Sequence, residues 1–310
     1  MKKMRVALIA GGKSSEREVS LKSGAQVYQA LNKDKYDIRR YDPADDLERL
    51  VREAPELDAA LIIMHGRGGE DGTIQGLLDL LGVPYQGSGV LASALAMNKE
   101  LSKILYLQAG LKSPHALVFT QKEAPSPQKI EKTLGLPAVI KPVNEGSSIG
   151  ITIARSQEEL QQGLAAAFKY DYRVLVEEFI EGIEVTGGIL GNAALQALPL
   201  VEILPAAAYP FFNYEAKYQA GASTEICPAR LSQELTEAAQ QCALIAHQAL
   251  GCRGYSRTDM KIRDGEIYVL ETNTIPGMTA TSLFPQGAQA AGIEFPALLD
   301  KLLELALEKN

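Results

Sequence analysis

Residues 255–273 read YSRTDMKIRDGEIYVLETN, and this stretch decides the architecture that we expect for the second half of the chain. Two runs with strand character, residues 255–262 and 266–273, flank the dipeptide Asp264-Gly265. Asp-Gly between two such runs is a strong signal of a tight turn between antiparallel strands. The segment therefore predicts an antiparallel β-hairpin.

Four polar residues of this hairpin, Arg257, Asp259, Glu271 and Asn273, occupy odd positions. Side chains alternate between the two faces of a strand, so the length of the turn decides which of them share a face. A strict two-residue turn would place Asp259 and Glu271 on opposite faces. We expect either a three-residue loop over 263–265 or a compensating bulge, because either one brings all four side chains to one face.

Two carboxylates and one amide supply oxygen ligands of the kind that magnesium prefers when it bridges nucleotide phosphates. Arg257 beside such an ion could stabilise charge that develops on an oxyanion or phosphoryl group. From spacing alone, the alternative of an exposed hairpin with ordinary surface charges stays open.

The first hundred residues repeat a unit of strand, glycine-containing turn and helix. Such repetition predicts a parallel sheet covered by helices, with ligands beyond the carboxyl ends of the strands, where residues 11–18 and 65–72 would lie. The helix after the first strand is expected to open with a capping box of Ser15 and Glu18. The expected elements are strands over 4–10 and 59–64, a glycine-rich turn over 66–69 and a helix over 73–81.

The pattern then changes to α+β. A long helix over 90–108 is expected to lead into strands over 136–141 and 151–154, separated by a small-residue loop over 144–150, and then into a helix over 156–168. Residues 204–229 show little periodicity and carry five aromatic side chains, which favours a functional lid.

Lys141 ends a predicted strand beside the small-residue loop, an arrangement suited to phosphate, although a plain flexible connection is the alternative. Residues 174–180, followed by Glu184, could present backbone groups to an adenine edge and a carboxylate to ribose, or could form a solvated turn. Glu16 either stabilises a helix dipole or pairs with a substrate ammonium. His65 is either structural or part of a site.

Composition and charge restrict the class of protein. The 310 residues suggest about two domains, 46% of them are hydrophobic, and the net charge is 31 − 38 = −7. This balance argues against a nucleic-acid or anionic-lipid surface. The three cysteines show no disulfide or zinc pattern and fit a reducing cytoplasm. The apolar run after Lys2-Lys3 is interpreted as a first strand rather than a signal peptide, and no membrane partner is expected.

Five segments, in order along nearly the whole chain, resemble the D-alanine:D-alanine ligases of the ATP-grasp superfamily. They are Glu16-Arg17-Glu18-Val19-Ser20, residues 65–72 (HGRGGEDG), Lys141-Pro142 with Glu145-Gly146-Ser147-Ser148, residues 214–218 (YEAKY) and residues 271–279 (ETNTIPGMT). With five such segments together, the local alternatives above lose most of their weight.

The resemblance implies a Rossmann-like N-terminal domain followed by a two-subdomain ATP-grasp fold. The implied domains are residues 1–98, a central subdomain over 99–183, and a C-terminal subdomain over 184–310 with the lid at 204–229. It also implies a homodimer.

The resemblance assigns the following roles in binding ATP and metal. Lys99, Lys141 and Lys217 would contact phosphates, with Ser148 in the loop that also binds ATP. The adenine hinge would consist of Glu177, Glu178, Phe179 and Ile180, with Glu184 at the ribose. Two Mg²⁺ ions, or Mn²⁺, would bind to Asp259, Glu271 and Asn273. Position 178 departs from the family, where lysine is found, but a hinge that acts through its backbone should still bind ATP.

The resemblance also implies how the amino acids bind. Glu16 would hold the ammonium of the first D-alanine near His65, and would form a triad with Ser147 and Tyr214 that closes the lid. Ser282 and Leu283 would receive the carboxylate of the second D-alanine, and Arg257 with the Gly277 backbone would hold the oxyanion. Tyr218 resembles the residue of the dipeptide-forming enzymes.

The implied reaction is ATP-dependent formation of D-alanyl-D-alanine for peptidoglycan precursors, through an acyl phosphate. One alternative is a related ligase that takes D-lactate as acceptor. Another, a non-catalytic nucleotide sensor, would be expected to lack a metal ligand or Arg257.

Overall fold

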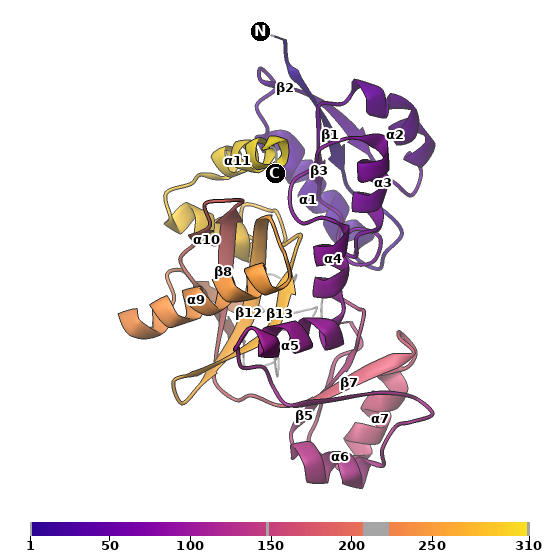
Figure 1. Ribbon diagram of the computed structural model, residues 1–310, viewed down its shortest axis with the longest axis vertical. Coiled ribbons are helices and arrows are strands. Elements are labelled where there is room, and N and C mark those ends of the chain that lie inside the picture. Colours follow the sequence, from indigo (N-terminus) through magenta and orange to yellow (C-terminus); the bar gives the residue numbers. More distant parts are fainter. Residues whose placement is uncertain (1, 147–148, 207–222, 309–310) are drawn as a thin grey trace.

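The computed structural model describes residues 2–146, 149–206 and 223–308, and its described residues form three sheets that follow one another along the longest axis of the molecule (Figure 1). The N-terminal sheet lies at one end, the largest sheet lies in the middle, and a four-stranded sheet lies at the other end. No helix in these ranges is both long and apolar enough to cross a bilayer.

The first sheet is parallel, as the repeated strand and helix units predict. Its strands β1 (Met4–Ile9), β2 (Tyr36–Tyr41) and β3 (Ala59–Ile62) are ordered β2-β1-β3. Alternate residues of β1 enter two different cores, with Val6 and Leu8 on one side and Ala7 and Ile9 on the other. The helices of this part are α1 (Arg17–Ala30), α2 (Leu47–Glu53), the 3-10 turn η1 (Ala54–Glu56) and α3 (Thr73–Leu81).

The expected capping box at the start of α1 is wrong. The helix begins at Arg17, so Glu16 is its N-cap residue, and no side chain caps it. Ser14 instead accepts a hydrogen bond from the Glu16 amide at 3.2 Å and donates to the His65 carbonyl at 2.7 Å. This contact joins the first two turns at the carboxyl edge of the sheet.

The single helix expected over 90–108 is in fact two helices, α4 (Val90–Met97) and α5 (Lys99–Gln108). Asn98 breaks the run because its backbone is extended (φ −85°, ψ 100°) and its side chain accepts from the Leu101 amide, which starts a new helix. Lys99 and Lys103 lie four residues apart and so fall on one face of α5.

The four-stranded sheet is antiparallel and has the order β4-β7-β5-β6. Ile130 and Leu160 belong to a core under this sheet. Its elements are β4 (Ala116–Thr120), α6 (Pro127–Leu134), β5 (Ala138–Pro142), β6 (Thr152–Ala154), α7 (Gln157–Ala167) and β7 (Arg173–Glu178).

The middle sheet is also antiparallel, with the order β11-β10-β8-β12-β13 and β9 paired to β8. Residues 204–205 and 223–226 of the 204–229 stretch are strand, which the absence of periodicity did not predict, while residues 207–222 lie outside the described residues and the lid stays a prediction. The elements are β8 (Ile183–Gly191), β9 (Gln196–Ala197), β10 (Val201–Pro205), β11 (Ser223–Ile226), α9 (Gln233–Ala249), β12 (Gly254–Arg263), β13 (Glu266–Asn273) and α10 (Leu283–Ala290).

The last helix, α11 (Phe295–Leu307), follows the middle sheet in the chain but packs against the first sheet (Figure 1). Leu298 and Leu302 of α11 share a fully buried core with Val6 of β1, and Tyr255 and Phe284 of the second half belong to the same core. One apolar cluster therefore fixes the first sheet relative to the middle one.

His247 of α9 provides a test of this packing. Its side chain is 1% exposed, its Nδ1 lies 2.7 Å from Ser256 Oγ, and burial lowers its pKa to about 4. The unfolded chain takes up this proton near pH 6.5, so the free energy of unfolding should fall by up to roughly 3 kcal/mol between about pH 6.5 and 4. We expect His247→Gln to flatten this part of the pH dependence, measured by urea unfolding at several pH values.

His115→Gln is the matched control, because solvent reaches the exposed His115 side chain in the folded as well as the unfolded chain. If the free energy of unfolding depended on pH equally in the wild type and in His247→Gln, a buried neutral histidine at position 247 would be contradicted.

Candidate active site

The hairpin of β12 and β13 brings its four polar residues to one face, by the bulge rather than by the longer loop. Arg263 pairs with Glu266, so the turn has only two residues, and the three-residue loop is wrong. Asp264 (φ 53°) and Gly265 (φ 80°) both adopt left-handed backbone angles, as a tight hairpin turn requires.

The register changes between Asp259 and Met260. Met260 pairs with Val269 and Asp259 pairs with Glu271, so Leu270 is the extra residue of a β-bulge. Beyond the bulge Arg257 pairs with Asn273. The compensating bulge expected from the sequence is confirmed.

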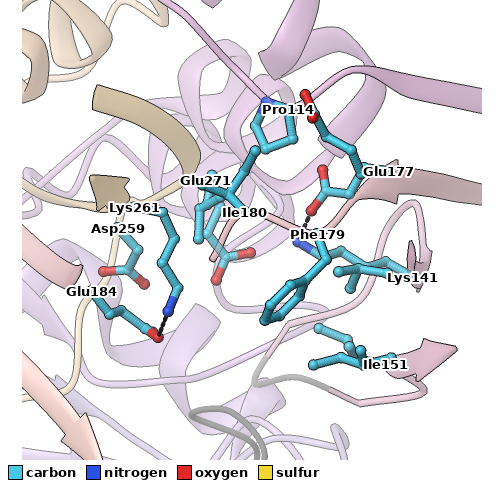
Figure 2. A pocket seen from close by; sticks show the side chains of 14 residues that line it. Pro114, Lys141, Ile151, Glu177, Phe179, Ile180, Glu184, Asp259, Lys261 and Glu271 are labelled. Carbon is cyan, nitrogen blue, oxygen red and sulfur yellow. Dashed lines mark ion pairs between the residues drawn. The ribbon is translucent and has the colours of Figure 1, made fainter. Parts of the chain in front are cut away.

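The neighbouring strand β8 adds partners to this face. Thr186, opposite Asp259 in the register, donates to Asp259 Oδ1 at 2.6 Å. Glu184, opposite Lys261, forms an ion pair with it at 2.8 Å (Figure 2). Lys261 was not among the predicted site residues, although it continues the odd-numbered alternation of Arg257 and Asp259.

A first cavity, called here the hinge cavity, lies between the four-stranded and middle sheets. Figure 2 shows Lys141, Glu184 and Asp259 facing this space from different elements. It gathers most of the residues assigned to nucleotide and metal, together with apolar walls that the sequence analysis did not identify. Its lining is Pro114, Val139, Lys141, Ile151, Ile153, Glu177, Glu178, Phe179, Ile180, Glu184, Asp259, Lys261, Leu270 and Glu271.

Glu177 is the buried anion of this cavity. Lys141 Nζ lies 2.5 Å from one of its carboxylate oxygens and Lys103 Nζ lies 2.7 Å from the other. Burial alone would raise the pKa of Glu177, but the two ammonium groups lower it to about 2. Burial opposes the charge of Lys141 as well, yet Glu177 and Glu271 raise its pKa above the ordinary value. The cavity therefore carries fixed charges at neutral pH.

The hinge segment is held by its own backbone. The amide of Glu178 donates to the His115 carbonyl at 3.0 Å, and the amide of Phe179 donates to the Pro137 carbonyl at 3.2 Å. The Glu178 carboxylate also accepts from the His115 amide at 3.0 Å. These hydrogen bonds fix the hinge between the chain at His115 and the chain at Pro137. The carboxylate of Glu178 contributes one of them.

A second cavity, called here the junction cavity, lies where the first sheet meets the middle sheet. It joins residues from both ends of the chain that the sequence analysis assigned to the amino acid substrates, and adds Glu70 and Glu225, which it missed. Its lining is Glu16, Val19, Lys22, Ser23, Gln26, His65, Glu70, Glu225, Arg257, Asn273, Ile275, Pro276, Gly277, Thr279, Thr281, Ser282 and Leu283.

Two features of the junction cavity suit an amino acid. Glu16 and His65 are nearly fully buried, and His65 Nδ1 lies 3.4 Å from Glu70 Oε1. At the other side, Ser282 is the N-cap residue of α10, so the positive end of a helix dipole faces this space. The cavity thus offers an anionic group at one side and an anion-binding helix end at the other.

A fork of hydrogen bonds separates the two cavities. Arg257 donates to both oxygens of Asp259 at 2.8 Å, and Asn273 Nδ2 lies 3.3 Å from Asp259 Oδ2. Arg257 and Asn273 line the junction cavity, whereas Asp259 and Glu271 line the hinge cavity. The predicted metal ligands therefore lie where the two cavities meet.

The donor set fits magnesium. Asp259 and Glu271 form a cross-strand pair that presents carboxylates to one cavity, and the side-chain amide of Asn273 lies beside them, with its Nδ2 3.3 Å from Asp259 Oδ2. In the parts of the chain described here, no three His, Cys, Asp or Glu side chains gather as a metal site, so Asp259 and Glu271 are the two carboxylates available to an ion at this place. Two carboxylates and an amide nonetheless match an ion that keeps several waters.

Of the remaining residues assigned to the site, one lies near the hinge cavity and the others lie outside the described residues. Lys99 begins α5 and does not line either cavity, but its Nζ lies 3.8 Å from Glu271 Oε2 and donates to the Glu145 carbonyl. Five residues lie outside the described residues: Ser147, Ser148, Tyr214, Lys217 and Tyr218.

Comparison with known proteins agrees with this geometry. A family model described as D-ala D-ala ligase N-terminus matches residues 5–48 and 39–88, and one described as D-ala D-ala ligase C-terminus matches residues 105–304. A D-alanine–D-alanine ligase of Syntrophobacter fumaroxidans is 61% identical over 99% of this chain and 98% of its own. One of Desulfotalea psychrophila is 54% identical over 99% and 96%.

Solved structures are similar throughout. The D-alanine–D-alanine ligase from Bacillus anthracis complexed with ATP superposes with a TM-score of 0.86 at 37% identity, over 98% of this chain and 97% of that one. The VanG D-Ala:D-Ser ligase from Enterococcus faecalis gives 0.84 at 33% identity, over 99% and 100%.

The fold and the paired cavities define an ATP-grasp ligase. Within that class, the chain belongs to the D-alanine:D-alanine ligase family.

Gly182, between the hinge and β8, tests how closely the hinge cavity is built. A β-carbon at this position would lie 2.0 Å from the Ile262 carbonyl oxygen, which belongs to the backbone of β12. Gly182→Ala should therefore displace the hinge, lower the free energy of unfolding by about 1–3 kcal/mol and weaken ATP binding. Urea unfolding and calorimetric titration with ATP measure the two effects.

Gly76→Ala is the control, because a β-carbon in the middle of α3 would meet only ordinary contact, 3.6 Å from a methyl group of Val90. If Gly182→Ala matched this control in both measurements, the tight approach of hinge and β12 would be wrong.

Proposed function

We propose that this protein joins two D-alanine molecules into D-alanyl-D-alanine with ATP, through an acyl phosphate, and so supplies peptidoglycan precursors. The observation that carries the proposal is the junction cavity. It brings Glu16, His65, Arg257, Gly277 and Ser282, separated by up to 266 positions, around one space next to the hinge cavity.

The first half-reaction places ATP in the hinge cavity. Its base lies between the apolar walls and the hinge, and Lys141 and Lys99 attract its phosphates. Asp259, Glu271 and Asn273 would hold two Mg²⁺ or Mn²⁺ ions, which would offset phosphate charge when bound. Supporting this, Lys141, Asp259 and Glu271 line the hinge cavity, and Lys99 Nζ lies 3.8 Å from Glu271 Oε2.

The first D-alanine binds in the junction cavity with its ammonium at Glu16, close to His65. Its carboxylate then attacks the γ-phosphorus of ATP, and ADP leaves with the electrons of the broken bond. Arg257, fixed by both oxygens of Asp259, faces the charge that gathers on the transferred group. The product of this step is D-alanyl phosphate.

The second D-alanine binds with its carboxylate at Ser282 and Leu283, where the N-terminus of α10 favours an anion. Its deprotonated amine attacks the acyl carbonyl. Arg257 and the Gly277 amide stabilise the tetrahedral oxyanion, and the C–O bond to phosphate then breaks. The dipeptide and phosphate are released, and the amine proton passes to solvent.

The proposal includes the residues outside the described ranges. Ser147 and Tyr214 couple with Glu16 to close a lid over the acyl phosphate, which water would otherwise hydrolyse. Ser148 and Lys217 contact ATP, and Tyr218 favours an amine acceptor over D-lactate. The support for these roles is the match of the five sequence segments to the family.

We also propose domains over 1–98, 99–183 and 184–310, a cytoplasmic location and a homodimer. The three sheets support the division, although α11 packs on the first sheet. Exposed apolar side chains on three helices support the dimer: Leu80 of α3, Leu91 of α4, and Leu101, Ile104 and Leu107 of α5. Sedimentation velocity should give about twice the 33.4 kDa chain mass, and the monomer mass would contradict the dimer.

The acceptor is the most direct test of the reaction. The purified protein with ATP and magnesium should release ADP in a D-alanine-dependent manner and form the dipeptide, identified by mass spectrometry. D-Serine and D-lactate should be poorer acceptors with D-alanine as donor. A preference for D-serine, as in the name of the VanG relative, or for D-lactate would overturn the acceptor assignment.

Glu271 tests the metal assignment. We expect Glu271→Gln to lower kcat by orders of magnitude with little change in the free energy of unfolding, because it removes a charged ligand from the surface of a cavity. Glu266→Gln at the exposed start of the same strand is the control and should leave kcat unchanged. Near-normal turnover of Glu271→Gln across a magnesium titration would rule out its role as a ligand.

A further inference from the structure

One buried cation, Lys103 of α5, takes no part in the reaction proposed above. The residue is 7% exposed, and it does not line either cavity. A lysine this deep is costly unless its charge is compensated, so its surroundings should show what the charge is for.

Three oxygen atoms surround the Lys103 ammonium. Glu177 Oε2 lies at 2.7 Å, Ser113 Oγ accepts at 2.8 Å and the Pro114 carbonyl accepts at 3.3 Å. Lys103 thus donates two hydrogen bonds and forms an ion pair with the Glu177 carboxylate. Burial holds the pKa of Lys103 below its ordinary value, although the Glu177 carboxylate partly opposes this effect. The group is therefore held in one position.

Glu177 lies between two lysines rather than in a simple pair. Its other oxygen lies 2.5 Å from Lys141 Nζ, and its side chain is almost fully buried. A pair of Glu177 and Lys141 alone would be neutral. Counted among these three groups alone, two ammonium groups and one carboxylate sum to a formal charge of +1. Of the two lysines, Lys141 lines the hinge cavity, where Glu271 and Glu184 also lie.

The same contacts connect the elements on both sides of the hinge cavity. Lys103 and Lys99 are four residues apart on α5, and Lys99 lies near Glu271 of β13. Ser113 Oγ donates onward to the Val269 carbonyl of β13 at 2.8 Å. Lys103 thereby links α5, the Pro114 wall, β7 and β13.

We propose that Lys103 is a positioning residue for the nucleotide: it fixes the Glu177 carboxylate and leaves Lys141 with the positive charge that an anionic phosphate requires. The inference rests on the proposed binding of ATP in the hinge cavity. Lys103 itself does not touch the nucleotide.

Lys103→Met removes the ammonium but retains the length of the side chain. We expect KM for ATP to rise about tenfold or more, with kcat and KM for D-alanine changed by less than about threefold, because the defect concerns nucleotide binding. Lys112→Met is the matched control, since Lys112 is exposed and pairs with Glu266 at the surface. An unchanged KM for ATP in Lys103→Met would overturn the proposal.

A double-mutant cycle tests whether Lys103 acts through Glu177. Glu177→Gln should raise KM for ATP, and adding Lys103→Met to it should have little further effect. Independent, multiplicative effects of the two changes would assign Lys103 a merely structural role. If Lys103→Met fails to fold, Ser113→Ala, which removes one partner of the ammonium, should give a smaller rise in KM, and no rise would overturn the proposal.

Direct titration with a non-hydrolysable ATP analogue, in the absence of D-alanine, separates this inference from the proposed reaction. If the wild type binds the analogue but does not turn over D-alanine, the proposed reaction is wrong. The role of Lys103 is then still tested by comparing the dissociation constants of the analogue for the wild type and Lys103→Met. If the wild type does not bind the analogue, the nucleotide site and the inference both fail.

Discussion

The β-bulge at Leu270 is the constraint on which the site depends. A two-residue turn at Asp264-Gly265 would leave Asp259 and Glu271 on opposite faces of the sheet, and the extra residue corrects this for every position beyond it. The corrected face then carries the Arg257–Asp259 fork, which lies between the two cavities. A register error of one residue here would separate the residues assigned to metal from those assigned to the oxyanion.

The core under the first sheet sets the second spatial requirement. Tyr255 of β12 and Phe284 of α10 pack edge to face in the cluster that also holds Leu298 of α11 and Val6 of β1. This packing places the Glu16 side of the junction cavity opposite the N-terminus of α10. The spacing between the two sides of the junction cavity thus depends on this apolar packing, to which the Ala280 amide adds a hydrogen bond to Gln26 of α1 at 3.4 Å.

The electrostatics of the hinge cavity depends on a few charges at fixed positions. Glu177 stays ionised because two lysines flank it, and Lys141 keeps its charge because Glu177 and Glu271 are near. A buried trio of this kind would be expensive if any member were lost, since the others would remain uncompensated. Its position at the hinge links the charge of the cavity to the position of α5 and β7.

The sequence by itself determined the local elements and the class of chemistry. Alternation and turn signals predicted the parallel first sheet, the hairpin and the α3 helix, and the family resemblance assigned residues that the two cavities bring together. It missed the break at Asn98, because that break depends on one side chain capping the next helix. It could offer the longer loop and the bulge only as alternatives, because the two give the same order of faces along the strands.

Only the tertiary structure decided the contacts made across long separations. The roles of Lys261 and Lys103 depend on strands and helices that lie side by side in space, and no spacing in the sequence reports that Lys103 reaches Glu177, 74 positions away. The packing of α11 on the first sheet is of the same kind, since an amphipathic helix indicates that it will be buried but not against which sheet. Local chain geometry is encoded by neighbouring residues, whereas the choice of partner is made by the packing of the whole chain.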